Sequence, residues 1–195
     1  MKKMPLLLVL LIALVGCVST RMISPEAKSR IFTIHINPEV IVNEKPIFVG
    51  PGAAFGLMGA LAEQDSACRL KTFARANDID IGQIAKTEFS KAFSKSGPFA
   101  VTDSKICDAT LNIHVKQYGV IGKRQSLTLY LYHGILCLIA NLTDQNGKVV
   151  WQQYGNGPKN GESFTIDEIF EDPEILRSAW TADVTNAVKK ILQNL

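Results

Sequence analysis

The sequence predicts an α+β fold, with a mainly antiparallel sheet of four or five strands and two helices packed on one face of it. Three observations lead to this fold class. Several short segments alternate apolar with polar side chains, as half-buried strands do. Two longer segments repeat apolar residues at helical spacing, and clusters of turn-forming residues separate the segments from one another.

The amino terminus has the pattern of an export signal. Two lysines precede an apolar run over residues 6–15, which is too short for a permanent membrane span. The run ends in Leu-Val-Gly-Cys at 14–17, which resembles the lipobox of bacterial lipoproteins. This resemblance implies that residues 1–16 are a signal peptide, cleaved between Gly16 and Cys17, and that Cys17 receives a diacylglyceryl group. The alternative is an ordinary secretory signal that happens to end in cysteine.

Lipidation at Cys17 predicts where the protein works. The next residue is Val18 rather than aspartate, which resembles lipoproteins that are sorted to the outer membrane. We therefore expect a lipid-anchored protein of the outer membrane that faces the periplasm and contacts the membrane through its lipid. Several acyl chains give a stable anchor where one does not, because each buried methylene contributes only about 0.8 kcal/mol.

The mature chain is expected to contain a tether and one domain. Residues 17–30 carry Ser, Thr, Pro and charges without periodicity, which indicates a lipidated tether that spaces the domain from the bilayer. Residues 31–195 are long enough for a single periplasmic α+β domain. The net charge of +3 includes the two leader lysines, so the mature domain is nearly neutral and no nucleic-acid partner is expected.

The first part of the domain combines a strand with an unusual glycine-rich segment. Apolar alternation predicts a strand over residues 31–37, which continues over 40–42 after a kink at Pro38. Residues 48–62 are uncharged and rich in Gly and Ala. Such a stretch is typical of a flexible or closely packed loop, and the alternative is an inserting hairpin or an oligomer contact.

Both helices are predicted from an apolar stripe and a capping residue. The first covers residues 80–96, with Asp80 as its cap and Gly-Pro as its stop, and a short strand follows it. The second begins after Asp172, with proline at its first position, and runs to the end of the chain. The acids at 167–174 surround this second start, where the helix dipole favours them, so a catalytic carboxylate pair is the weaker alternative.

An antiparallel meander is predicted between the two helices. Placing the apolar residues of 111–116 and 127–132 on one face requires Ile113 opposite Leu131, because a one-residue slip would invert one strand. This register turns His114 to the polar face beside Tyr130 and His133 inward. The apolar phase changes after Gly134, which indicates a bulge there, and an Asp-Gln-Asn-Gly turn leads into the next strand.

The cysteine count predicts one disulfide. With Cys17 assigned to the lipid, three cysteines remain in a compartment that permits disulfides. The predicted register sets Cys107 opposite Cys137, so we expect these two to pair, with free buried thiols as the alternative; the state of Cys68 is left open. The cysteines lack the close spacing of zinc ligands, so no metal and no cofactor is expected.

Two motifs carry a further resemblance. The strand start Asp-Ala-Thr-Leu at 108–111 and the hairpin from Asp144 to Trp151 resemble the small α/β unit of bacterial envelope lipoproteins. Members of this group include the curli-export lipoprotein CsgG, YajG-type lipoproteins and the amino-terminal domain of TolB. The resemblance implies docking in an envelope assembly and provides no catalytic residues.

We therefore expect a non-enzymatic accessory or scaffold protein of an outer-membrane assembly, which binds an envelope protein or a second copy of itself. The alternative is a periplasmic binder of lipid or of another envelope ligand, with the glycine-rich segment at 48–62 as its lid.

Overall fold

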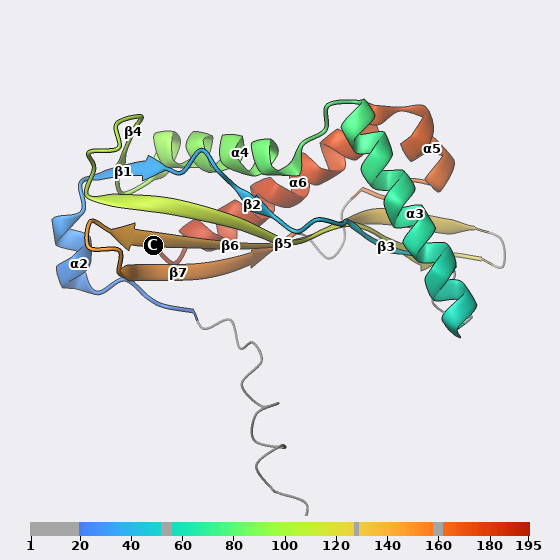
Figure 1. The fold of residues 1–195 in the computed structure, drawn as a ribbon, viewed down its shortest axis with the longest axis horizontal. Helices are drawn as coiled ribbons and strands as arrows, with labels where there is room; N and C mark the ends of the chain where they lie inside the picture. The colour runs from blue at the N-terminus through green and yellow to red at the C-terminus, as the bar shows by residue number, and fades with distance from the viewer. Residues whose placement is uncertain (1–19, 52–55, 127–128, 158–161) are drawn as a thin grey trace, which may run out of the picture.

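A seven-stranded mixed sheet, with helices packed on one of its faces, forms the centre of the protein (Figure 1). The computed structural model describes residues 20–51, 56–126, 129–157 and 162–195. The predicted cleavage and lipidation site at Gly16 and Cys17 lies outside these ranges. Within the described ranges, no helix is both long enough and apolar enough to cross a membrane.

The sheet joins an antiparallel meander to a parallel half. β5, β6 and β7 are consecutive antiparallel neighbours. Along the other edge of β5 run three short strands parallel to it, and β4 pairs in parallel with the first of these. In chain order the strands are β1 (Thr33–Ile36), β2 (Ile41–Val42), β3 (Ile47–Val49), β4 (Ala100–Thr102), β5 (Ala109–Arg124), β6 (Tyr130–Asp144) and β7 (Val149–Asn156).

The largest helices pack against the sheet and against each other. α4 and α6 lie side by side on the face made by β5, β6 and β7, and α3 crosses the end of the sheet beside β3 (Figure 1). The described helices are α2 (Pro25–Arg30), α3 (Gly56–Ala76), α4 (Ile81–Ser96), α5 (Ile166–Glu171) and α6 (Pro173–Leu192).

The predicted helix starts are confirmed. Asp80 caps α4 by accepting hydrogen bonds from two main-chain amides at 2.7 and 3.1 Å. Asp172 caps α6 by accepting from the main-chain amide of Glu174 at 2.9 Å. Thr165 and Glu168 form a reciprocal capping box at the start of α5. Several of the acids at 167–174 therefore stabilise helix ends, as their position predicts.

The α+β class is confirmed, but the expected strand and helix counts and the mainly antiparallel arrangement are not exact. The structure has seven strands in a mixed sheet and five described helices. β1, β2 and β3 contain only four, two and three residues, too few for apolar alternation to identify β2 and β3 as separate strands. Their parallel pairing with β5 depends on long crossover connections, which sequence periodicity does not encode.

α3 begins within the segment where a loop was expected, residues 48–62. β3 ends at Val49, residues 52–55 lie outside the described ranges, and the helix begins at Gly56. Within residues 61–76 of α3, the buried side chains are Ala67, Leu70 and Ala74. This part of the helix lacks the wide apolar stripe by which α4 and α6 are recognised in the sequence.

The β5–β6 hairpin is longer than predicted and has a different register. Ile113 lies opposite Ala140 and not opposite Leu131. From Tyr132 onward β6 turns alternate residues inward, and the bulge lies on β5 rather than at Gly134. The leucines before Tyr132 caused the error, because their alternation is out of phase with the buried set of β6.

The amino-terminal segment belongs to the domain from residue 21 onward. The main chain of Arg21 exchanges two hydrogen bonds with Gln152 on β7, at 2.8 and 2.9 Å, and its guanidinium donates to the carbonyl of Val149. Ser24 then caps α2. The tether expected over 17–30 is thus shorter in the structure, because edge pairing and a helix cap fix residues 21–30 on the domain.

α6 supplies the contact that fixes the helical layer on the sheet. Its predicted apolar stripe is buried, and the indole of Trp180 donates to the main-chain oxygen of Gly119 on β5 at 3.2 Å. Gly119 has φ +145°, and a Cβ atom there would overlap the carbonyl of Ile47 on β3. This glycine is therefore required for β3 to lie against β5.

Gly119→Ala should lower the free energy of unfolding by about 3 kcal/mol, because the substitution combines left-handed strain with the overlap at Ile47. Gly147→Ala is the matched control: Gly147 has φ +77° but no atom near its Cβ position, so its cost should be about 1 kcal/mol. Urea unfolding of both variants measures the difference, and equal costs would contradict the close approach of β3 to β5.

Candidate functional site

The described helices leave one face of the β5–β7 meander uncovered, and we call it the open face. Nearly all of its side chains are half-buried or exposed, whereas those of the opposite face are buried under α4 and α6. The open face consists of Thr110, Asn112, His114, Gln117 and Ile121 on β5, His133, Ile135, Cys137, Ile139, Asn141 and Thr143 on β6, Gln152 and Tyr154 on β7, and Ile41 on β2.

Amide side chains form a ladder at one end of the open face. Asn37 donates to the side chain of Asn112 at 3.0 Å. Asn112 in turn donates to Asn141 and to Thr143, both at 3.1 Å. Side chains held by one another in this way are ordered before a partner arrives, which reduces the entropy lost on binding. This end offers donors and acceptors without net charge.

The other end of the open face is more apolar and is hollowed. Ile121, Ile135 and Cys137 line a depression of about 340 Å³ together with Gln117 and His133. On β2, beside the middle of β5, Ile41 is 58% exposed. An ordered amide ladder next to accessible aliphatic side chains suits contact with another protein surface, where apolar burial and hydrogen bonds act together.

Both strand histidines lie on the open face. His114 lies opposite Ile139 and His133 lies opposite Ile121, so the predicted inward position of His133 is wrong. Burial lowers the pKa of each imidazole, and a nearby lysine lowers it further, so both are neutral at pH 7. The two histidines are about 20 Å apart along the sheet, and they do not form one cluster.

The structure contradicts the predicted disulfide between Cys107 and Cys137, since both are free thiols. Cys107 lies before β5, with its sulfur 3.2 Å from the main-chain oxygen of Ala109, whereas Cys137 lies opposite Gln117 on the open face. The prediction failed because it depended on the wrong register. Cys68 is also free and is exposed on α3.

A carboxyl group is buried beneath the hollow of the open face. Asp183 on α6 is 2% exposed, and its Oδ2 atom has no hydrogen-bond partner among the described residues. A Cβ atom on Gly134 would overlap this oxygen, and one on Gly157 would lie 2.8 Å from the carboxyl carbon. Desolvation raises the pKa of Asp183 to about 7.

Sequence reasoning missed Asp183, although a signal was available. The residue occupies a position of the apolar stripe of α6, three residues after Trp180 and one before Val184. A lone acid inside such a stripe indicates either a partner or a raised pKa, because an unpaired buried charge is costly. Here the two small glycines provide the space that the carboxyl group occupies.

A second hollow, which we call the turn cleft, lies beside the connection between α3 and α4 and has a volume of about 440 Å³. Tyr118 and Trp180 line it, with their rings edge to face at 5.3 Å. Burial and the charge of Asp80 raise the pKa of Tyr118, so its hydroxyl remains protonated. The exposed side chains of Lys71 and Arg75 also line the cleft, whose size suits a small ligand.

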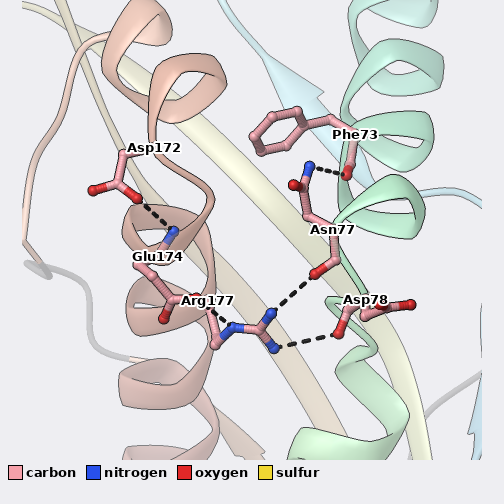
Figure 2. A network of polar contacts seen from close by, with 6 residues as sticks. All are labelled: Phe73, Asn77, Asp78, Asp172, Glu174 and Arg177. Atoms are coloured by element: carbon pink, nitrogen blue, oxygen red, sulfur yellow. Dashed lines mark hydrogen bonds and ion pairs between the residues drawn. The ribbon is translucent and has the colours of Figure 1, made fainter.

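Arg177 of α6 holds the wall of the turn cleft in place (Figure 2). Its guanidinium donates to the main-chain oxygens of Asn77 at 2.9 Å and Asp78 at 3.3 Å, where α3 ends. Glu174 orients the guanidinium from one turn earlier on α6, at 2.9 Å. Asp78 has φ +52°, the left-handed position at which a glycine commonly ends a helix, and Arg177 compensates by satisfying the last carbonyls.

The sequence matches no family model and no curated protein. The structure is similar to that of protein XCC0632 from Xanthomonas campestris, of the family model DUF330, with a TM-score of 0.51 and 15% identity over 91% of this chain and 86% of that one. This likeness shows a shared fold.

Two further solved structures are similar at lower scores. They are a minor lipoprotein from Acinetobacter baumannii (TM-score 0.41, 8% identity, 83% of this chain and 87% of that one) and the PelC dodecamer from Paraburkholderia phytofirmans (TM-score 0.42, 12% identity, 89% and 95%). Both are too distant to support an argument about this chain. The expected resemblance to CsgG, YajG-type lipoproteins and TolB stays a prediction.

Asp183→Asn should stabilise the protein above pH 7 and change its pH profile. Because the native pKa of about 7 exceeds the unfolded value, native protein binds more protons between about pH 4 and pH 7, and its stability falls as pH rises through that window. Full ionisation costs up to about 4 kcal/mol on this basis, and the amide removes that cost. Urea unfolding from pH 4 to pH 8 measures the free energy of unfolding of the unsubstituted protein, of Asp183→Asn and of the control Asp65→Asn, in which an exposed carboxyl group is replaced. The same pH dependence in all three proteins would contradict the burial of an unpaired carboxyl group.

Proposed function

We propose that the protein is a lipid-anchored accessory or scaffold protein of a bacterial outer-membrane assembly, and that its open face docks on an envelope partner in the periplasm without catalysing a reaction. The observation that supports this function best is the one-sided sheet. Its helical layer covers one face of β5–β7, and the described helices leave the other face accessible.

The composition of the open face supports a protein partner. Accessible Ile41 and the half-buried aliphatic residues around the hollow can lose water on contact, while the ladder through Asn112 and Asn141 offers fixed hydrogen-bond groups. The charged side chains near these groups include Lys116, beside His114 and Cys137, and Lys123, beside His133. The partner we propose therefore presents an apolar patch bordered by polar groups that can also accept hydrogen bonds from these lysines.

The anchor in this proposal is the lipid on Cys17, as the lipobox resemblance implies. Attachment to the outer membrane concentrates the domain in a thin layer at the membrane surface, so that a weak docking surface is occupied more often than in free solution. The alternative function is binding of lipid or of another envelope ligand, for which the turn cleft provides the space.

Photo-crosslinking in intact cells tests this function. Benzoylphenylalanine at Gln117 and at Ile41 should give adducts of one defined mass with a second protein, because both positions are exposed on the open face. The matched control is the same side chain at Lys95, which is exposed on α4. A ligand-binding function predicts no protein adduct from the open face, so adducts that are absent, or that are equally frequent from Lys95, would contradict docking.

A further inference from the structure

The chain that follows the anchor first meets the domain at the β7 edge of the sheet. Arg21 pairs with Gln152 of β7, so the chain is fixed to the sheet only four residues after Cys17. Four residues span at most about 14 Å even when fully extended. The polar headgroup layer on each side of a bilayer is about 5–8 Å thick. A lipid on Cys17 therefore leaves Arg21 within a few ångströms of the headgroups.

The side chains at this edge fit a membrane surface. Met22 is 64% exposed and Tyr154 on β7 is 48% exposed, although both are large. Amphipathic aromatic side chains favour the interface between headgroups and hydrocarbon. Antiparallel pairing places Arg21 and Gln152 on the open-face side and Met22 on the other, so Met22 and Tyr154 flank the edge from both sides.

The charge of the edge is complementary to lipid phosphate. Neither residues 18–23 nor residues 149–157 contain an acid. Arg21 supplies one cation, and Lys190 of α6 supplies a second, with its ammonium 3.1 Å from the main-chain oxygen of Asn156 at the end of β7. A basic group close to an anionic surface contributes about 1 kcal/mol to membrane binding.

We propose that the β7 edge, with Met22 and Tyr154, rests on the surface of the membrane that holds the lipid. This inference depends on the lipidation of Cys17 in the proposed function. Because the membrane meets an edge of the sheet and not its plane, the open face is directed sideways and stays accessible to a partner. The short connection to the lipid then holds the domain against the membrane surface, so that the domain does not move freely relative to the bilayer.

Spin labels test this orientation in the full lipidated protein, reconstituted in vesicles of phosphatidylethanolamine and phosphatidylglycerol. Met22→Cys and Tyr154→Cys are labelled in a background in which Cys68 and Cys137 are serine, with Lys95→Cys on α4 as the matched control. Power saturation should show the first two labels several-fold less accessible to an aqueous nickel complex than the control label. Equal accessibility at all three positions would overturn the proposal.

An insertion of about 15 Gly/Ser residues after Ser19 tests the role of the short connection, because such a linker reaches about 20 Å on average. The insertion should return both edge labels to the accessibility of the control label, and contact that survives it would overturn the role assigned to the connection. Intact mass of the same preparation separates the two proposals. Unacylated Cys17 would overturn both, whereas acylated Cys17 with aqueous edge labels would overturn only this inference.

Discussion

The close approach of α6 to the sheet is the contact on which the rest of the structure depends. Gly155 of β7 lies so near Ala187 that a Cβ atom would overlap the main-chain oxygen of that residue. Trp180 reaches β5 with its indole, and Arg177 ties α6 to the end of α3. One helix thus connects two strands of the meander with the helix at the end of the sheet. Close packing of this kind depends on small residues where the backbones meet.

The packing of α4 and α6 on one side of the meander underlies the separate roles that we propose for its two faces. The covered side contains the core, including the buried carboxyl group of Asp183, while the amide ladder and the aliphatic hollow lie on the open side. The amino-terminal segment pairs with the β7 edge at Gln152, so less of that edge is available for strand addition. A partner is therefore expected to meet a face of the sheet and the membrane to meet its edge.

Sequence reasoning succeeded where a local signal decides the structure. Asp80 and Asp172 identify their helices because a cap is a contact between near neighbours in the chain. It failed where distant pairing decides. The strand predicted over 31–37 and 40–42 contains β1 and β2, but β3 and the parallel pairing of all three with β5 were not predicted, and the leucines before Tyr132 gave a plausible but wrong register. The open face could not be derived, since nothing local shows which side of a sheet the helices cover. Cys17 is likewise predicted from adjacent residues alone, and because it lies outside the described residues its lipidation stays a prediction.

The native thiols provide the most direct test of the claim that the open face is the working surface. Cys137 lies on that face, at the hollow, and Cys68 is exposed on α3 away from it. The test measures the rate of alkylation of each thiol in intact envelopes and after purification in detergent. Burial raises the pKa of Cys137, so the two thiols differ in intrinsic reactivity and each rate is compared only with the rate of the same thiol in the other preparation. The account predicts that Cys137 reacts more slowly in envelopes while Cys68 reacts at the same rate in both. An unchanged rate at Cys137 would contradict it.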